Sequence, residues 1–363
     1  MTKKPTTTPV KRVNCAATTV ASIDIKRRDI GPIKRTLSAS LPGEGVSLDM
    51  STMANPAVIA HRGACGYLPE HTLQAVELAH QQGADYLEQD VVLTADGIPI
   101  VLHDVTLELT TNVESIFDGR QRDDGLFYAI DFTLAEIKRL TAHERTDHSG
   151  KAVFPNRYNG DAIHFEIPTL AEEIELVDAL NAKTGKSAGL YIELKRPEFH
   201  ESEGADLYTS VLQVLREYDR LDDHPETVIQ CFDPVTLKRV QSDGIFKGPR
   251  VQLILTETIL GMRGDVQMMH TSEGVHQIAE YAHGIGPDVS LLEDDHGAPS
   301  VMLKAAKKLG LFLHPYTLRA DSESLPGVDF ASLHKKLFID LGVDGAFSDF
   351  PDQTRALLQL LGK

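Results

Sequence analysis

The sequence predicts an α/β protein built as a (β/α)8 barrel with an insertion over one mouth. From Pro56 onward, short β-branched runs alternate with segments of helical period, which is typical of parallel strands joined by helices. About eight such repeats in roughly 300 residues favour a closed barrel over an open sheet. The composition, 42% hydrophobic and 25% charged over 363 residues, is that of a globular protein with its own core.

Eight segments have the composition of strands. In chain order they cover residues 58–61, 85–92, 98–103, 189–195, 227–232, 251–255, 311–316 and 344–348. Several helices between them have marked starts. The T-L-A-E sequences at 133–136 and 169–172 are capping boxes, in which the threonine hydroxyl and the glutamate carboxylate satisfy backbone donors reciprocally. Asp233 before Pro234 places an N-cap residue ahead of a proline that suits the first helical turn.

The stretch between the strand 98–103 and the helix start at 169 does not follow the repeat. It contains one predicted helix, 134–141, but no clear strand-helix unit, and it is rich in Gly, Asp, Arg and His. Long loops at a barrel mouth usually carry substrate contacts. We therefore predict an insertion at about 112–168 within a barrel domain that spans 55–363.

Charge is distributed unevenly along the chain. Residues 1–49 hold nine basic and four acidic residues, whereas the rest of the chain carries 27 basic and 49 acidic residues, a net charge of −22. Such a surface repels nucleic acids and anionic membranes, so nucleic acid is excluded as the main partner. Residues 1–54 are predicted to form a poorly ordered tail outside the barrel.

The sequence contains no predicted membrane span, because no stretch approaches the roughly 20 consecutive apolar residues that a span requires. The segment 15–23 after the basic start is rich in Thr and Ala and is too weakly apolar for the core of a signal peptide. Three cysteines, Cys15, Cys65 and Cys231, are too few and too scattered for a disulfide framework. We therefore expect a cytoplasmic protein.

Polar residues gather where the apolar runs end. His61 and Arg62 follow the run 58–60, and His103 and Asp104 follow the run 98–102. In a parallel barrel these carboxyl ends share one face, which is where barrel enzymes have their active sites. The pattern therefore predicts one site that contains both histidines.

Strand alternation adds carboxylates to this site. Residues i and i+2 of a strand project to the same side, so Glu88 and Asp90 share a face. Glu193 and Lys195 likewise share a face of another strand. Three carboxylates in one cavity raise each other's pKa unless a cation neutralises them, and oxygen ligands suit Ca²⁺ or Mg²⁺. The alternative is a solvated strand edge for the first two carboxylates and an ion pair of Glu193 with Lys195 or Arg196.

The histidines and the neighbouring cations indicate phosphoryl chemistry. His61 and His103 can exchange protons near neutral pH, and two such residues facing a cavity form an acid/base pair. The alternative for each is a core histidine bonded to a backbone carbonyl. Arg62 and Lys195 can hold an anionic substrate beside the carboxylates. A metal, two cations and two histidines together favour a phosphoryl-transfer reaction.

The motifs lie in the order H-R-G at 61–63, P-E-H-T at 69–72, E-Q-D at 88–90, L-H-D at 102–104 and E-L-K at 193–195. With them, the chain resembles the glycerophosphodiester phosphodiesterase family in its longer bacterial, periplasmic-type branch. Further matching segments are 128–134, 230–233, 284–288, 314–317 and 348–352. The resemblance covers nearly everything from Ala57 to the end of the chain.

The resemblance implies a distorted TIM barrel that hydrolyses glycerophosphodiesters, such as glycerophosphocholine and glycerophosphoethanolamine, to sn-glycerol 3-phosphate and an alcohol. It implies export as well, which makes the periplasm the alternative location. The roles that it implies are general acid and base for His61 and His103, ligation of Ca²⁺ (alternatively Mg²⁺) for Glu88, Asp90 and Glu193, and substrate binding for Arg62, Lys195, Glu70, Phe232, His314 and Tyr316.

The mechanism that follows is a hypothesis. Glycerol hydroxyls and a phosphate oxygen are bound to the metal, one histidine removes a proton from the 2-hydroxyl or from water, and the other protonates the departing alcohol. Two other functions remain open. A lysophospholipase D-type phosphodiesterase requires a wide apolar groove for an acyl chain, and a non-catalytic phosphodiester-binding protein lacks the acid or the base.

Overall fold

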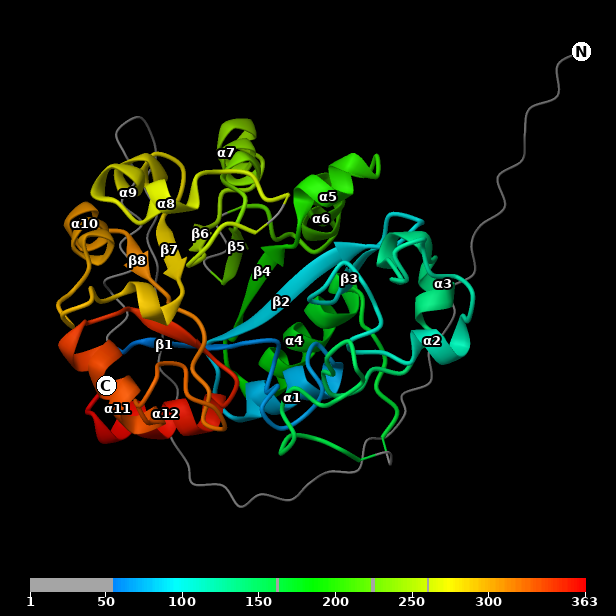
Figure 1. Ribbon diagram of the computed structural model, residues 1–363, viewed down its shortest axis with the longest axis horizontal. Helices are drawn as coiled ribbons and strands as arrows, with labels where there is room; N and C mark the ends of the chain where they lie inside the picture. Colours follow the sequence, from blue (N-terminus) through cyan, green and yellow to red (C-terminus); the bar gives the residue numbers. More distant parts are fainter. Residues whose placement is uncertain (1–54, 161–162, 223–225, 260) are drawn as a thin grey trace, which may run out of the picture. The chain divides into compact units, whose positions relative to one another are not determined.

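Eight parallel strands form a barrel that is surrounded by helices (Figure 1). The computed structural model describes residues 55–160, 163–222, 226–259 and 261–363, so the predicted tail, 1–54, lies outside the described residues. The barrel strands are β1 (Ala57–Ala60), β2 (Tyr86–Leu93), β4 (Gly189–Leu194), β5 (Thr227–Cys231), β6 (Arg250–Ile254), β7 (Gly284–Pro287), β8 (Phe312–Leu313) and β9 (Gly345–Ser348).

The order of the hydrogen-bonded strands is β8-β7-β6-β5-β4-β2-β1-β9. Backbone hydrogen bonds then join the two ends of this path: Asp344 donates to the carbonyl of Leu313 and Phe347 donates to the carbonyl of Pro315. A parallel sheet that returns to its own first strand has no open edge. The predicted barrel is therefore confirmed.

One predicted barrel strand is wrong, and one barrel strand is absent from the prediction. Within 98–103, β3 (Pro99–Val101) pairs antiparallel with β2 and lies outside the barrel. The missing strand is β7, whose two glycines and proline are depleted in strands. A Cβ on Gly284 would lie 2.4 Å from the ring of Phe312, and one on Gly286 would lie 2.6 Å from Leu253. Close packing inside the barrel therefore excludes the β-branched residues that identify the other strands.

The helix starts that the sequence marks are confirmed. Capping boxes open α3 (Leu134–Ile137) and α4 (Leu170–Thr184), and Asp233 caps α7 (Pro234–Asp243). The helix α3 is shorter than the predicted 134–141. The other helices are α1 (Leu73–Gln81), α2 (Val113–Ile116), α5 (Pro197–Ser202), α6 (Leu207–Glu217), α8 (Val266–Met269), α9 (Ser272–Ala279), α10 (Val301–Leu309), α11 (Phe330–Lys335) and α12 (Pro351–Leu360), with short helical turns at Ala129–Asp131, Val289–Leu291 and Lys336–Asp340.

Apolar residues fill the lower part of the barrel and leave the upper part to polar ones. The residues that pack together at this floor are Ala57, Ile59, Tyr86, Tyr191, Val228, Val251, Phe312 and Phe347. A larger core lies between the strands and the surrounding helices. Because the strands alternate, the residues two positions beyond the floor also face the barrel interior, nearer its mouth.

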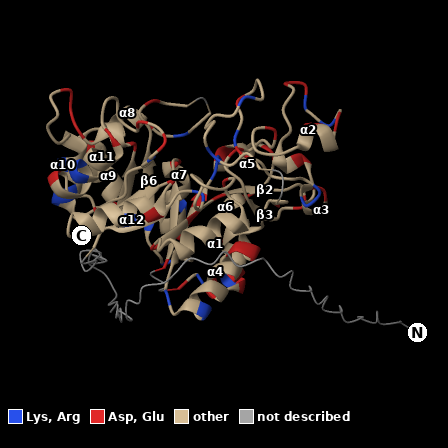
Figure 2. Cartoon of the chain, turned by 90° about the horizontal axis from the view of Figure 1, so that it is seen from below, with Lys and Arg blue, Asp and Glu red and all other residues tan. Residues whose placement is uncertain are grey.

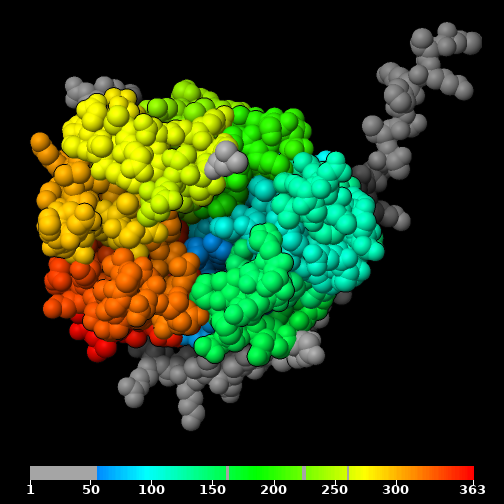
Figure 3. Space-filling model, viewed as in Figure 1, coloured from blue at the N-terminus to red at the C-terminus, as the bar shows by residue number. Residues whose placement is uncertain are grey.

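The segment between β3 and α4 packs around a small hydrophobic cluster of its own, which includes Leu107, Phe117, Phe127 and Phe132. In Figure 3 this cyan and green segment lies along one side of a central hollow, and the yellow and orange loops lie along the other. The segment therefore forms part of the wall around the barrel mouth.

Acidic residues are spread over helices and loops, whereas α10 carries a group of lysines (Figure 2). Within the described ranges, none of the helices combines the length and the apolar character that crossing a membrane requires.

Candidate active site

A cavity of about 140 Å³ opens at the carboxyl ends of the barrel strands. Nine of the predicted site residues line it: His61, Arg62, Glu88, Asp90, His103, Glu193, Lys195, Phe232 and Tyr316. Five further residues, none of them predicted, complete the lining: Gln230, Leu253, Thr317, Arg319 and Phe347. The structure therefore brings together most of the residues that the sequence patterning selected.

The register between strands places the carboxylates side by side. Asp90 of β2 lies opposite Glu193 of β4, and Glu88 is two residues before Asp90 on the same face. All three are at least 94% buried. The inward orientation of these carboxylates, predicted from strand alternation, is confirmed because all three line the cavity.

Burial of these charges shifts their pKa values in different directions. Burial, with the charges of Asp90 and Glu193, raises the pKa of Glu88 well above its usual value. Burial also raises the pKa of Glu193 to about 8, against the opposing effect of Lys195. For Asp90, burial is outweighed by Lys195, His103 and other partners, which hold its pKa well below the usual value. Burial therefore disfavours the charged form of Glu88 and Glu193, whereas the charged form of Asp90 is favoured.

His71 joins this group, although the sequence patterning predicted no role for it beyond its place in P-E-H-T. Its Nε2 lies 2.7 Å from Asp90 Oδ2, and ligand atoms of His71, Glu88 and Asp90 all lie within 4.8 Å of one another, close enough to hold a metal ion. His71 has a φ of 57°, in the left-handed region. Backbone strain of this kind persists where the surrounding structure fixes a side chain, often at functional sites.

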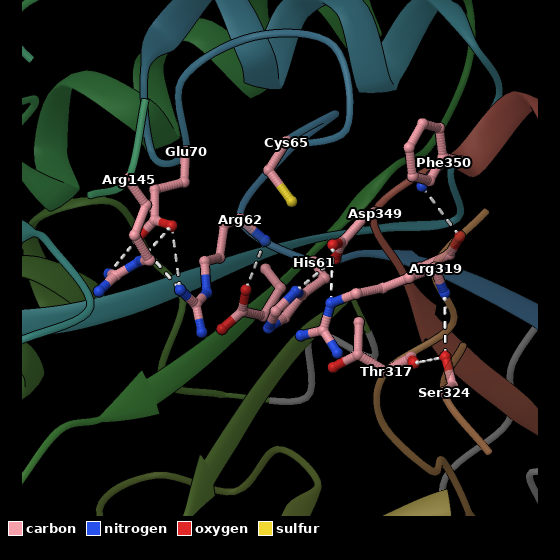
Figure 4. A network of polar contacts seen from close by, with 12 residues as sticks. His61, Arg62, Cys65, Glu70, Arg145, Thr317, Arg319, Ser324, Asp349 and Phe350 are labelled. Atoms are coloured by element: carbon pink, nitrogen blue, oxygen red, sulfur yellow. Dashed lines mark hydrogen bonds and ion pairs between the residues drawn. The ribbon is translucent and has the colours of Figure 1, made fainter. Parts of the chain in front are cut away.

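His61 forms a hydrogen-bonded pair with a carboxylate from the last strand. Its Nδ1 donates to Asp349 Oδ1 over 2.7 Å. The other oxygen, Asp349 Oδ2, accepts from Arg157 Nη2 at 2.6 Å and from Arg319 Nε at 3.1 Å, as Figure 4 shows in part. Sequence reasoning did not assign Asp349 a role, although its position directly after an apolar strand is the signal that identified His61.

His103 forms the second such pair. Its Nδ1 donates to Asp104 Oδ1 over 2.7 Å, and Asp104 Oδ2 accepts from Arg145 Nη1 at 2.7 Å. His103 lines the cavity as predicted, but it does not follow a parallel barrel strand. It reaches the cavity because β3 runs antiparallel to β2, so that Leu102 donates a backbone hydrogen bond to Asp90.

Both histidines are neutral near pH 7 in this arrangement. Burial, followed by the charge of Arg62, lowers the pKa of His61 to about 4, although Asp349 acts in the opposite direction. Burial, followed by Arg62 and Lys195, likewise lowers the pKa of His103 to about 4. A neutral imidazole whose Nδ1 donates to a carboxylate has a free lone pair on Nε2.

Glu70 contacts the arginines and does not line the main cavity. Its carboxylate accepts from Arg62 Nη1 at 3.1 Å and from Arg145 Nη2 at 2.6 Å (Figure 4). Arg62 also donates its backbone N–H to Glu88 Oε2 over 2.7 Å. Glu70 therefore fixes the guanidinium of Arg62, which does face the cavity.

Tyr316 and His314, the two predicted substrate residues near the end of the chain, lie at different depths in the barrel. Tyr316 lines the cavity, where its ring packs edge-on against Phe232 with centroids 5.9 Å apart. His314 does not line the cavity. It is 1% exposed, its Nδ1 is hydrogen-bonded to the hydroxyl of Tyr191 at 3.0 Å, and its ring packs on Phe312. His314 is two residues before Tyr316, so it faces the same side one level deeper than Tyr316, in the barrel core.

Comparison with known proteins agrees with this arrangement. The model of the glycerophosphoryl diester phosphodiesterase family matches residues 61–353. The glycerophosphodiester phosphodiesterase of Haemophilus influenzae is 34% identical, over 88% of this chain and 96% of that protein. That of Treponema pallidum is 33% identical, over 81% of this chain and 89% of that protein.

Solved structures show the same fold. A putative glycerophosphoryl diester phosphodiesterase from Silicibacter pomeroyi superposes with a TM-score of 0.64 at 24% identity, covering 85% of this chain and 95% of that one. A phosphodiesterase from Oleispira antarctica, solved in complex with the product sn-glycerol-3-phosphate, gives a TM-score of 0.57 at 25% identity, covering 84% of this chain and 97% of that one.

Proposed function

The chain belongs to the glycerophosphoryl diester phosphodiesterase family, and from this membership we propose that its cavity hydrolyses glycerophosphodiesters to sn-glycerol 3-phosphate and an alcohol. The observation that carries the proposal is the pair of histidines at one cavity, each with a carboxylate on its Nδ1. Three further carboxylates and three cations, Arg62, Lys195 and Arg319, line the same cavity of about 140 Å³. This concentration of charge favours a small diester over a lysophospholipid, whose acyl chain requires a wide apolar groove.

A divalent cation fits the buried carboxylates Glu88, Asp90 and Glu193. Burial and the neighbouring carboxylates raise the pKa of Glu88 and Glu193, which a cation would counteract, and Asp90 Oδ1 accepts no hydrogen bond from the described residues. Carboxylate oxygens suit a hard ion, with His71 as a neighbour of Glu88 and Asp90, and we propose Ca²⁺, with Mg²⁺ as the alternative. When bound, such an ion neutralises the carboxylates and polarises a phosphoryl oxygen.

Arg62 and Lys195 are proposed to bind the phosphate. Both line the cavity, and Glu70 and Glu193 respectively hold them in place, with Lys195 Nζ 2.8 Å from Glu193 Oε1. A guanidinium offers two parallel donors and an ammonium acts as a point charge, so together they bind the non-bridging oxygens of a phosphodiester.

The two histidines are proposed to move the protons. One takes a proton on its Nε2 from the 2-hydroxyl of the glycerol or from water, and the other gives a proton to the departing alcohol. Asp349 and Asp104 hold the rings with Nδ1 protonated, which leaves Nε2 free for this exchange. The negative charge of the bound phosphodiester raises both pKa values from about 4 and so favours protonation of the acid.

The test is release of sn-glycerol 3-phosphate from glycerophosphocholine by protein stripped with EDTA and then supplied with Ca²⁺ or Mg²⁺ separately. We expect one ion to restore turnover, and we expect His61→Ala and His103→Ala each to lower kcat by about 10²–10⁴-fold. Full activity in EDTA would refute the proposed role of the carboxylates as metal ligands. No turnover with either ion in a folded sample would refute the proposed reaction.

A further inference from the structure

Gln230 is a buried polar residue of the cavity that the mechanism above does not use. It lies on β5, is 1% exposed and lines the cavity beside the proposed metal ligands. Its Oε1 is buried and has no hydrogen-bond partner among the described residues. Because a buried polar atom without a partner is unfavourable, the carboxamide is expected to gain its partner from the ligand.

The position of Gln230 limits which part of the substrate it can meet. It lies opposite Glu193 in the register of β5 with β4. Lys195, which we assign to the phosphate, is two residues nearer the mouth along β4, and its Nζ reaches back to 2.8 Å from Glu193 Oε1. Gln230 therefore faces the carboxylate level of the cavity from the strand next to the one that carries Lys195.

On its mouth side, Gln230 has apolar neighbours in the lining. Phe232 and Leu253 each lie two residues nearer the mouth, Phe232 beyond Gln230 itself and Leu253 beyond Val251, its partner on β6, and both can pack on a short carbon chain. A carboxamide both donates and accepts, and an alcohol hydroxyl does the same. The phosphate already has Arg62 and Lys195 as partners, and an uncharged amide adds little to them.

We propose that the Gln230 carboxamide binds the terminal hydroxyl of the glycerol moiety, the one farthest from phosphorus, and thereby selects glycerol over alcohols that lack it. This inference rests on the proposed function, because it assumes that the phosphate lies between Arg62 and Lys195. A site that hydrogen-bonds a substrate hydroxyl rejects the analogue without it, since the protein group is then left unpaired.

The test compares glycerophosphocholine with its analogue built on propane-1,2-diol, which keeps the 2-hydroxyl and lacks only the terminal one. We expect the wild-type protein to show a kcat/KM about 10 to 100-fold lower for the analogue. In Gln230→Leu the two substrates should differ by less than about threefold, and the kcat/KM for the analogue should stay near that of the wild type. Gln230→Met, which keeps an unbranched side chain, serves if the leucine variant does not fold.

A second readout does not depend on turnover. The dissociation constant of sn-glycerol 3-phosphate should rise about 10-fold or more in Gln230→Leu, whereas that of inorganic phosphate should not change. Thr317→Val is the matched control, because it removes a different neutral group from the same lining. It should keep the wild-type ratio between the two substrates.

Three results would overturn the inference: a substrate ratio that Gln230→Leu and Gln230→Met leave unchanged, a ratio that collapses in Thr317→Val instead, or a weakening of Ca²⁺ binding in calorimetry by more than about 10-fold in Gln230→Leu. The last result would make Gln230 a metal ligand. Failure of the proposed function gives a different result, because the wild-type protein would then hydrolyse neither substrate while product binding still reports on Gln230.

Discussion

Asp349→Asn changes one atom of the site and isolates the contribution of the carboxylate to His61. Arg157 and Arg319 both donate to Asp349 Oδ2. In the variant, they will keep the amide oxygen of the asparagine on their side, because an NH₂ group facing two guanidiniums has no acceptor. The NH₂ group must then face His61 Nδ1, which lay 2.7 Å from a carboxylate oxygen.

This exchange reverses the tautomer of the ring. With Nδ1 accepting from the amide, the single proton of neutral His61 moves to Nε2, which can no longer accept a proton from the substrate. The same substitution at an orienting aspartate of a serine protease triad lowers kcat by about 10⁴-fold. We expect a loss of about 10³ to 10⁴-fold here if His61 is the base, or about 4 to 5.5 kcal/mol in the barrier.

The variant will also be less stable. Asp349 is 1% exposed, and its loss of charge leaves Arg319 without an anionic partner among the described residues, whereas Arg157 keeps Asp321. Removing one partner of a buried ion pair costs about 3 kcal/mol. Thermal unfolding therefore accompanies the kinetic assay, which measures kcat for glycerophosphocholine at saturating Ca²⁺.

Asp104→Asn is the matched control, since Asp104 makes the equivalent contact to His103. Its side chain is 26% exposed and bonded to a single arginine, so solvent can compensate and the loss should be smaller, about 10 to 100-fold. A folded Asp349→Asn protein with kcat within tenfold of the wild type would refute the orienting role of Asp349.

Three further predictions concern stability. Burial raises the pKa of Glu173 from 4.5 to about 8, so the folded protein binds more protons than the unfolded chain between these values and loses stability as the pH rises through that window. Glu173→Gln should remove this loss, and its unfolding free energy relative to the wild type should increase by about 3 to 5 kcal/mol between pH 4 and pH 9 in urea titrations; a constant difference would contradict the assignment. Thr169→Ala removes the capping box of α4 and should cost about 1 kcal/mol, seen as a lower Tm, and an unchanged Tm would show that the cap contributes nothing. Gly284→Ala forces a Cβ to within 2.4 Å of the Phe312 ring and should cost about 1 to 3 kcal/mol in the same titrations, whereas equal stability would show that β7 can move aside.

Much of the site could be predicted because strand alternation is a local property. A carboxylate at every second position of an apolar run must face away from its aliphatic neighbours. For Glu88, Asp90 and Glu193 that rule was sufficient, and all three line the cavity. The capping boxes were predictable for the same reason, because four consecutive residues contain the whole hydrogen-bonding pattern.

Other features depended on partners far along the chain. Asp349 is 288 residues from His61, and Arg157 reaches Asp349 from the segment between β3 and α4. The position of Asp349 after an apolar strand marks it as a residue of the barrel mouth, but nothing in the local sequence pairs it with His61 or identifies Arg157 as its partner. The same holds for His71 and Gln230, because only the neighbours that the closed barrel places beside them identify these two residues as part of the site.

The sequence by itself determined the barrel, its helix starts, the inward carboxylates and the two histidines, because each follows from periodicity or from a motif a few residues long. The tertiary structure alone decided that β3 turns back and β7 completes the barrel, that His314 lies beneath the cavity, and that each histidine has an aspartate on its Nδ1. The physical reason is that these depend on strand direction, depth and long-range charge pairing, which arise only when the sheet closes on itself.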